Sequence, residues 1–355
     1  MLDESLHIRL GEAIPHVKDC LLAGLVPMLR GSPAIGKSAV IHGVAAELDY
    51  LVIDARFAGY DPTDINGFPD LDRERGVAKY FPLETFPLDD QEIPVNPATG
   101  RPYAGWLLFC DELNSAPPSV QAASYKLFLD RMVGQRKLHK DVHICAAGNL
   151  DTDQAITHEM STALISRLIN FVVLPDLKLW MQWAQGPGQI RSLVTSYLEW
   201  RGGEHFYTFD NNEPNQPYAA PRTWEFVNDL LNVWNGNPTG KLVPIAGCIN
   251  LVAADFIAFA ALRVHLPKKS DVLSNPETAQ LPNAYDPGPL YALTGALGDW
   301  FEEAHADKLM TYINRMPADF QVVTMRNIIR RGGQKLMGQK DVSAWMQANC
   351  DAFMA

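Results

Sequence analysis

Short apolar runs alternate with helix-like patterns through the first half of the chain. The runs occupy residues 51–54, 106–110, 142–147 and 171–174, and a further one lies within 24–30. Each run is continuously apolar instead of alternating with polar residues, which is typical of strands buried on both faces of a parallel sheet. The pattern therefore predicts an α/β fold with a parallel sheet, and such sheets bind ligands at the carboxyl ends of their strands.

The pattern changes between residues 57 and 105. Turn-forming residues dominate the stretch 61–69, and proline and polar residues dominate 89–102. Neither stretch has a strong helical period, and both compositions are typical of turns and exposed loops. We therefore expect an insertion over 57–105 that carries hairpins.

Helical periodicity replaces the strand pattern after Pro175. Residues 180–200 and 223–234 are the clearest periodic stretches, and 245–266 is the most apolar long stretch. Asp255 lies inside this last stretch, and an aspartate near the centre of a membrane span costs about 2.5–3.5 kcal/mol on insertion scales. We expect a single buried helix of a soluble domain there, and no membrane span.

These patterns predict three consecutive parts. The first is an α/β core over 1–176, which contains the insertion. The second is a helical region over 177–269, and the third is a C-terminal helical extension over 270–355. The boundary between the last two is placed at a linker, 270–289, that contains four prolines.

Charge and cysteine usage narrow the class of protein. The chain has 355 residues, a formal net charge of −11 and a sequence pI of about 5.3. Proteins that mainly grip nucleic acid usually present a basic face, so this charge argues against that class. The five cysteines are odd in number, lie far apart and form no C-x-x-C pair, which argues against a disulfide framework or a cysteine metal site. A reducing, cytoplasmic location is the simpler interpretation.

A set of basic residues near the C-terminus has helix-like spacing: Arg326, Arg330, Arg331, Lys335 and Lys340. A solvated helix face is the simpler interpretation of this set. A surface for an acidic partner or for nucleic acid is the alternative.

A glycine-rich loop carries the strongest chemical signal. The segment reads Gly31, Ser32, Pro33, Ala34, Ile35, Gly36, Lys37 and Ser38, which fits the nucleotide-binding pattern G-x-x-x-x-G-K-[ST]. Glycine allows the tight turn that brings backbone N–H groups to phosphate oxygens. Lys37 adds positive charge near the β- and γ-phosphates, and Ser38 offers a hydroxyl to Mg²⁺. Residues 39–48 predict a helix whose N-terminus faces the phosphate, whereas a plain glycine-rich turn is the alternative.

Two acids follow the apolar run that ends at Cys110. Asp111 would hold Mg²⁺ beside Ser38, and Glu112 would orient and deprotonate the attacking water. The alternative is a helix N-terminus, where acids are favoured electrostatically. Because the glycine-rich loop precedes the acids, nucleotide hydrolysis is the better interpretation.

Three further polar residues occupy positions that suit the same reaction. Asn149 follows the run 142–147 and could hydrogen-bond the γ-phosphate or the water, although Gly-Asn is also common in turns. Arg167 is a candidate arginine finger that acts in a neighbouring subunit, and an ordinary surface arginine is the alternative. Arg222 starts a predicted helix, where a cation is unfavourable, so a functional role gains weight.

In this order, the motifs resemble the MoxR branch of the AAA+ ATPases over about residues 10–235. The matching segments are 31–38 as Walker A, 107–114 as Walker B, 116–117 with 121–129 downstream, 61–67 as the opening of the helix-2 insertion, Gly148-Asn149 as sensor 1, Ser166-Arg167 as the arginine finger and Pro221-Arg222 as sensor 2. The resemblance implies a P-loop AAA+ core followed by a helical lid, which hydrolyses ATP to ADP and phosphate with Mg²⁺.

The resemblance also implies an assembly. Such proteins form rings, most often hexamers, with ATP at each subunit boundary and a finger supplied in trans. Relatives commonly act as chaperone-like remodellers of proteins, often with a partner that bears a von Willebrand factor A domain. That partner would be a separate chain here. Ser166-Arg167-Leu168 departs from the more usual Asp-Arg-Phe, so Arg131 and Arg136 stay alternatives for the trans arginine, and residues after about 240 match no short lid.

Two other functions fit the same motifs. One is a nucleic-acid-stimulated AAA+ motor, which would show strong salt-dependent binding to DNA. The other is a nucleotide-gated scaffold without turnover. The intact pair Asp111-Glu112 argues against the scaffold, because a scaffold needs no base.

Overall fold

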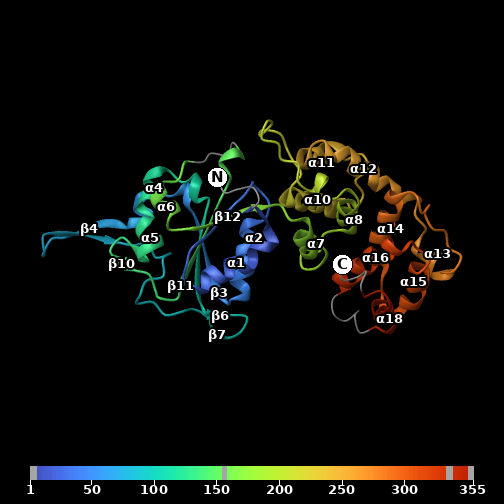
Figure 1. Ribbon diagram of the computed structural model, residues 1–355, viewed down its shortest axis with the longest axis horizontal. Coiled ribbons are helices and arrows are strands. Elements are labelled where there is room, and N and C mark those ends of the chain that lie inside the picture. Colours follow the sequence, from blue (N-terminus) through green and yellow to red (C-terminus); the bar gives the residue numbers. More distant parts are fainter. Residues whose placement is uncertain (1–5, 154–157, 333–338, 351–355) are drawn as a thin grey trace. The chain divides into compact units, whose positions relative to one another are not determined.

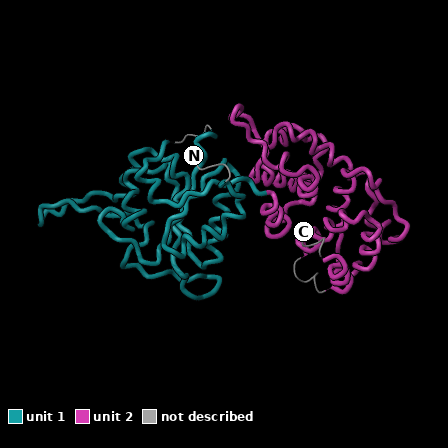
Figure 2. Tube along the Cα trace, in the orientation of Figure 1, with its two compact units in different colours: residues 1–176 teal, residues 177–355 magenta. Residues whose placement is uncertain are grey.

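The computed structural model describes residues 6–153, 158–332 and 339–350. The chain divides into two compact units, residues 1–176 and 177–355 (Figure 2). Each unit is described by itself.

A six-stranded sheet forms the centre of the first unit (Figure 1). Every neighbouring pair of strands in it is parallel. The spatial order is β1 (Ile8–Arg9), β12 (Ile169–Leu174), β2 (Pro27–Arg30), β11 (Val142–Gly148), β8 (Gly105–Asp111) and β3 (Tyr50–Arg56). The predicted α/β class and the predicted apolar strands are thereby confirmed.

Helices cover both faces of this sheet, which explains why its strands are continuously apolar. Leu108 and Cys110 of β8 pack in one cluster with α4 (Pro118–Ala123), α5 (Tyr125–Asp130) and α6 (Thr162–Ile165). On the opposite face, the Phe109 ring contacts His42 of α2 (Lys37–Glu47), and α1 (Leu10–Leu22) packs beside α2. Every side chain from 106 to 110 is therefore buried.

The insertion contains hairpins, as expected. After α3 (Pro62–Asn66), β4 (Phe68–Asp72) pairs with β5 (Val77–Phe81), and further on β6 (Val95–Asn96) pairs with β7 (Arg101–Pro102). A second short hairpin, β9 (Met132–Val133) with β10 (Arg136–Lys137), lies outside the insertion. Gly67 enters β4 with φ +87°, and a Cβ there would lie 2.5 Å from the Phe81 carbonyl oxygen, so only glycine fits.

The second unit consists of helices and connecting loops in its described residues. Its α-helices are α7 (Leu177–Gln185), α8 (Ser192–Arg201), α9 (Gly203–Phe206), α10 (Pro221–Val233), α11 (Leu242–Ile249), α12 (Val252–Leu262), α13 (Lys269–Ser274), α14 (Pro287–Trp300), α15 (Ala306–Ile313), α16 (Ala318–Gly332) and α18 (Lys340–Ala348). In the described part of the chain, no helix is both long and apolar enough to cross a membrane.

The single helix predicted over 245–266 is wrong. The segment is two helices, α11 and α12, because Asn250 has a non-helical backbone, with φ +49° and ψ −126°, that ends the first. Apolar residues continue on both sides of the break, because both helices bury part of their surface in the same cluster.

Two hydrophobic clusters stabilise the second unit. One surrounds Tyr197, Trp224 and Phe256, and the other surrounds Tyr312 and Met325. Helix α14 contributes residues to both clusters, so the segments 177–269 and 270–355 share a core element. The division of this unit into a lid and an extension stays a prediction.

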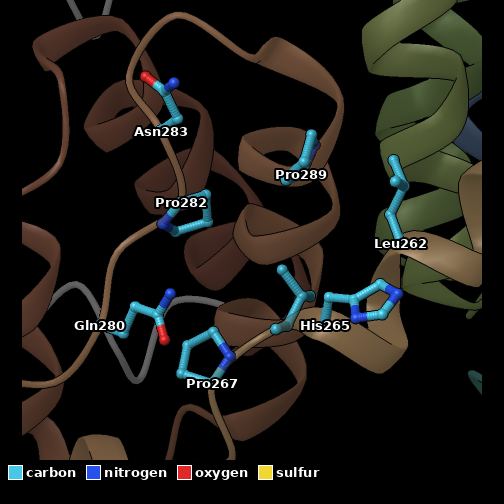
Figure 3. Close-up of a pocket in the computed structure, with 8 residues that line it drawn as sticks. Leu262, His265, Pro267, Gln280, Pro282, Asn283 and Pro289 are labelled. Atoms are coloured by element: carbon cyan, nitrogen blue, oxygen red, sulfur yellow. The ribbon is translucent and has the colours of Figure 1, made fainter.

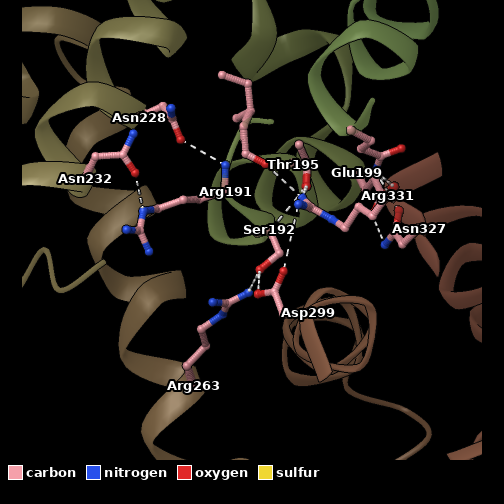
Figure 4. Close-up of polar contacts among 12 residues, drawn as sticks. Arg191, Ser192, Thr195, Glu199, Asn228, Asn232, Arg263, Asp299, Asn327 and Arg331 are labelled. Atoms are coloured by element: carbon pink, nitrogen blue, oxygen red, sulfur yellow. Dashed lines mark hydrogen bonds and ion pairs between the residues drawn. The ribbon is translucent and has the colours of Figure 1, made fainter. Parts of the chain in front are cut away.

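A largely buried set of polar side chains links α7, α8, α14 and α16, and we call it the polar layer (Figure 4). Its members are Gln185, Ser192, Thr195, Glu199, Arg263, Asp299, Asn327, Arg330 and Arg331. Arg331 donates to the carbonyl of Ile190 at 2.9 Å and to Thr195 Oγ1 at 3.2 Å, and it pairs with Asp299 at 3.9 Å. Arg263 donates to Ser192 Oγ, which in turn donates to Asp299.

The same layer corrects the interpretation of the C-terminal basic residues. Arg330 donates to Gln185 Oε1 at 2.7 Å, and burial lowers the pKa of both Arg330 and Arg331. Glu199 accepts hydrogen bonds from Gln185 and Asn327, and burial raises its pKa. A solvated face is therefore wrong for these two arginines, and Lys335 lies outside the described residues.

The second unit also has a shallow pocket of about 180 Å³ (Figure 3). Its lining is largely apolar and rich in proline: Leu262, His265, Leu266, Pro267, Gln280, Pro282, Asn283 and Pro289. None of these residues was predicted to take part in chemistry. The pocket brings no set of reactive groups together, so it is not the candidate site.

Candidate functional site

The candidate site lies at the carboxyl ends of β2, β11 and β8, which are adjacent in the sheet. The loop after β2 carries Lys37 and Ser38, the turn after β8 carries Glu112, and the loop after β11 carries Asn149. Because parallel strands end at the same edge, these polar groups converge although they are far apart in sequence. The structure brings together Lys37, Ser38, Asp111 and Asn149 as predicted.

The glycine-rich loop is shaped by close backbone packing. A Cβ on Gly31 would lie 2.6 Å from the Val173 carbonyl oxygen, so this position requires glycine. Gly36 adopts φ +101° and precedes the first residue of α2. No side chain caps the N-terminus of α2, and its first turn contains no acid. Unpaired N–H groups at a helix start attract anions, so the loop suits a phosphate.

Lys37 is the cation of this loop and is only 8% exposed. Its Nζ donates to the carbonyl oxygens of Gly31 at 2.6 Å and Ser32 at 2.9 Å, and to Asn149 Oδ1 at 3.2 Å. A lysine at the start of a helix is unfavourable against the helix dipole. A bound anion would remove that cost, so the position of Lys37 favours phosphate binding.

Asp111 is held by two hydrogen bonds. Its Oδ2 accepts from Ser38 Oγ at 3.1 Å, and its Oδ1 accepts from the backbone N–H of Glu112 at 2.9 Å. A carboxylate and a hydroxyl side by side are the oxygen ligands that Mg²⁺ prefers when it also binds phosphates and water. Among the described residues, no cluster of three or more His, Cys, Asp or Glu could hold a metal alone. The donor set therefore fits Mg²⁺ that arrives with a phosphate ligand.

Glu112 has an uncommon backbone conformation. Its φ is +55° and its ψ is 34°, in the left-handed region, and the 3₁₀ turn η3 (Leu113–Ser115) follows directly. A non-glycine residue there costs about 1–2 kcal/mol. The side chain is exposed, beyond the end of β8. Strain of this kind is often retained at functional sites because it aims a side chain.

Asn114 was not predicted to have a role of its own, although it closes the Walker B match. Its side chain is fully buried and bonds both backbone groups of Asn149: Oδ1 accepts from the N–H at 3.1 Å, and Nδ2 donates to the carbonyl at 2.8 Å. Sequence offers little signal for this pairing, because the partner of the side chain is a backbone.

The loop after β11 adds two acids that the sequence analysis did not identify. Both belong to η4 (Asp151–Asp153). Asp151 accepts from Arg30 at 2.6 Å, and Asp153 Oδ1 accepts from Ser32 Oγ at 3.3 Å. Asp153 is 4% exposed, and burial raises its pKa. The phosphate loop is thus attached to the loop after β11 at several points.

The three candidate trans arginines all have partners within the first unit. Arg167 donates to the Ala163 carbonyl, and its guanidinium lies 5.3 Å from the centre of the Tyr125 ring. Arg131 donates to the Gly24 carbonyl at 2.6 Å, and burial lowers its pKa.

The third candidate, Arg136, pairs with Asp89 and Asp90 at 3.0 Å each. Within the described part of the unit, the structure joins none of these three arginines to Lys37 or Asp111 by a hydrogen bond or ion pair. Their assignment to a neighbour's site stays a prediction.

Arg222 lies in the second unit, exposed in the first turn of α10. The expectation that this cation lacks a local reason stays a prediction. Burial and the charge of Asp229 raise the pKa of Glu225, and the Arg222 charge opposes that rise, so an acid one turn away interacts with it. Its predicted role toward a nucleotide stays a prediction.

Comparisons with known proteins give limited information. No protein-family model matches the chain, and no curated protein matches it. Solved structures that align with it include a candidate ATPase from Cytophaga hutchinsonii, with 12% identity, 89% of this chain and 80% of that chain covered, and a TM-score of 0.36.

NtrX from Brucella abortus also aligns, at 14% identity, in a complex with ATP (97% of this chain, 67% of that chain, TM-score 0.38) and in a second structure (95% and 67%, TM-score 0.33). At these low values the alignments carry no argument about activity. The α/β assignment rests on the strand order itself.

Proposed function

We propose that this protein is an ATPase of the AAA+ class, of the MoxR type, which hydrolyses ATP to ADP and phosphate. The observation that carries the proposal is the convergence of Lys37, Ser38, Asp111 and Asn149 at the ends of three adjacent parallel strands. Motif order supports the same class, because each of these residues comes from a segment that resembles the corresponding AAA+ motif.

The loop 31–38 would bind the phosphates. Lys37 and the uncapped N-terminus of α2 would hold the β- and γ-phosphates. Ser38 and Asp111 would hold Mg²⁺, which supplies positive charge against the phosphate oxygens. Their hydroxyl and carboxylate are already in contact, so no rearrangement of the chain is needed to bring them together.

Glu112 and Asn149 would act on the attacking water. Glu112 would accept a proton from the water, which requires that its carboxylate come within hydrogen-bond reach. Asn149 would orient the water or the γ-phosphate with its side-chain amide. In the structure Asn149 Oδ1 lies 3.2 Å from Lys37 Nζ, so this amide is at the phosphate-binding end of the site.

We propose that Arg167 completes the site of a neighbouring copy in a ring, most often a hexamer, and that Arg222 acts in its own subunit. Transferring phosphoryl groups gain much of their stabilisation from such arginines. ATP turnover would drive remodelling or chaperone-like activation of a separate protein partner, with a von Willebrand factor A domain as one candidate. A cytoplasmic location fits this function.

Subunit mixing tests the function and the trans arginine together. We expect Lys37→Ala to abolish ATP binding and Arg167→Ala to preserve binding but abolish turnover, when phosphate release is measured. Mixing the two inactive variants should restore activity, because an intact site from one variant then meets an intact finger from the other. Arg136→Ala tests the alternative finger and should keep its activity if Arg167 acts in trans, and the exposed Lys178→Ala is the control.

Three outcomes would contradict parts of the proposal. Absence of ATP hydrolysis by the wild type would refute the ATPase. No restoration on mixing, although both variants assemble by mass measurement, would refute Arg167 in trans. Hydrolysis that depends on DNA and weakens steeply with salt would favour the motor instead.

A further inference from the structure

The residues at the end of β11 are held from two sides. β11 pairs with β2 as far as Gly148, whose register partner is Arg30, but it pairs with β8 only as far as Ala146. Beyond that point, the Gly148 carbonyl accepts from the Gly31 N–H at 3.2 Å. The phosphate loop therefore holds one side of this segment by a backbone hydrogen bond.

On the side of β8, where strand pairing has ended, the Asn114 side chain holds the segment Gly148-Asn149 instead. Its amide group bonds both the N–H and the carbonyl of Asn149, at 3.1 and 2.8 Å. A Cβ on Gly148 would lie 2.2 Å from Asn114 Oδ1, so the amide rests directly against the Gly148 backbone. An amide side chain has one acceptor and two donors, and this geometry uses both kinds.

The place of Asn114 in the chain connects two parts of the site. It belongs to η3, which begins directly after Glu112. A shift of this turn would therefore move the base and the support of Asn149 together. Lys37 Nζ contacts Asn149 Oδ1, so the connection continues to the phosphate loop.

We propose that Asn114 is a positioning residue of the ATPase site, which fixes the Asn149 side chain relative to the water and the γ-phosphate. The inference rests on the proposed ATPase function and adds a residue to it. Asn114 is fully buried and takes no part in the chemistry itself, so its effect passes through Asn149. Misplacement of a catalytic group by about 1 Å can cost about 100-fold in rate.

A double-mutant cycle tests whether Asn114 affects turnover through Asn149. We would measure kcat and KM for ATP with the wild type, Asn114→Ala, Asn149→Ala and the double variant. Asn114→Ala should lower kcat by about 100-fold with KM changed by less than about threefold. In the Asn149→Ala background the same substitution should lower kcat by less than about threefold, because the group that it positions is already absent.

Asn114→Asp gives a second readout that a purely structural role would not move. The carboxylate retains the acceptor for the Asn149 N–H but places an unpaired oxygen against the Asn149 carbonyl. Protonation restores a donor, and a carboxyl in this setting has a raised pKa. The deficit of Asn114→Asp relative to the wild type should therefore shrink as the pH falls from 8 to 6.

Gln121→Ala is the matched control. Gln121 is also a buried amide, and it donates to the Ala116 carbonyl at 3.0 Å without contacting Asn149. Gln121→Ala should lower stability, but it should not lower kcat selectively as Asn114→Ala does. If Asn114→Ala fails to fold, Asn114→Asp is combined with Asn149→Ala in the same cycle.

The outcomes separate the inference from the proposed function. Equal losses of kcat in both backgrounds, or no loss at all, would overturn the role of Asn114 while leaving the ATPase in place. Absence of turnover by the wild type would overturn the ATPase and this inference with it.

Discussion

The two units treat their polar side chains in opposite ways. In the first unit, Lys37, Ser38 and Asp111 gather at strand ends, where oxygen atoms and a helix start face the same place. In the second unit, most polar groups of the polar layer bond one another: Arg331 donates to the Ile190 carbonyl and pairs with Asp299, although Arg263 Nε and Arg331 Nε have no hydrogen-bond partner among the described residues (Figure 4). The strand ends of the first unit are suited to bind a ligand. The polar layer of the second unit instead uses its polar groups for contacts between helices.

The difference shows why a buried charge is not by itself a functional signal. Burial raises the pKa of Glu199 in the polar layer and of Asp153 beside the phosphate loop. Glu199 accepts from two amides, whereas Asp153 Oδ2 has no hydrogen-bond partner among the described residues. The surroundings of each acid, more than its pKa, separate a structural group from one beside a binding site.

The largest effect on stability should come from the polar layer. Arg331→Met removes the charge-assisted hydrogen bonds to the Ile190 carbonyl and to Thr195 Oγ1 and leaves both acceptors without this donor, so we expect the second unit to lose about 3 kcal/mol of stability. Tryptophan fluorescence during denaturant unfolding is a suitable measure, because seven of the eight tryptophans lie after residue 176.

The exposed cation Lys178 provides a control, since Lys178→Met should change stability by less than about 0.5 kcal/mol. A fully stable Arg331→Met would show that the polar layer is not structural. ATP turnover per folded molecule should be unchanged by this variant.

A smaller effect, on activity instead of stability, should come from Ser38. Ser38→Ala removes a proposed Mg²⁺ ligand and should lower kcat by about 100-fold, which corresponds to about 2.7 kcal/mol in the barrier. Higher Mg²⁺ should recover part of the loss. Phosphate release over a range of Mg²⁺ concentrations measures both, with the exposed Ser119→Ala as the control, and an unaltered Mg²⁺ dependence would contradict the assignment.

The smallest effect should come from Asp153. Burial raises its folded-state pKa above the unfolded value of about 3.9, so the folded chain binds this proton more tightly. Stability is therefore lost as the pH rises through the window between the two pKa values, and no cost exists below it. Asp153→Asn should gain up to about 1 kcal/mol at pH 8 and nothing below about pH 4.

Hydrogen exchange of the β2 and β11 amides at several pH values measures this gain. Asp151→Asn is the control, because Asp151 is 60% exposed and paired with Arg30, so it should show no gain. A gain for Asp153→Asn that does not depend on pH would contradict the burial argument.

Much of the first unit was predictable because its signals are local. The run 106–110 is apolar throughout since helices cover both faces of β8, and Asp111 follows where the strand ends. The spacing within 31–38 predicts a phosphate loop because its fixed positions, two glycines, a lysine and a serine, each meet a backbone, charge or hydroxyl requirement. The convergence of these residues then follows from the parallel sheet.

Other features depend on contacts that no local pattern records. Asn114 bonds the backbone of Asn149, 35 positions away, and a backbone group has no sequence signature. The break at Asn250 lies between apolar runs that belong to one cluster, and a single asparagine there does not by itself predict the end of a helix. The partners of Arg330 and Arg331 lie on α7, α8 and α14, far from their own segment.

The central claim is that the strand ends of the first unit hydrolyse ATP with Glu112 as the base. Its most direct test is to measure ATP binding and phosphate release side by side for the wild type and Glu112→Gln. The account predicts binding within about threefold of the wild type and turnover lowered by about 1,000-fold. Equal turnover by the two proteins, or no turnover by the wild type, would contradict it.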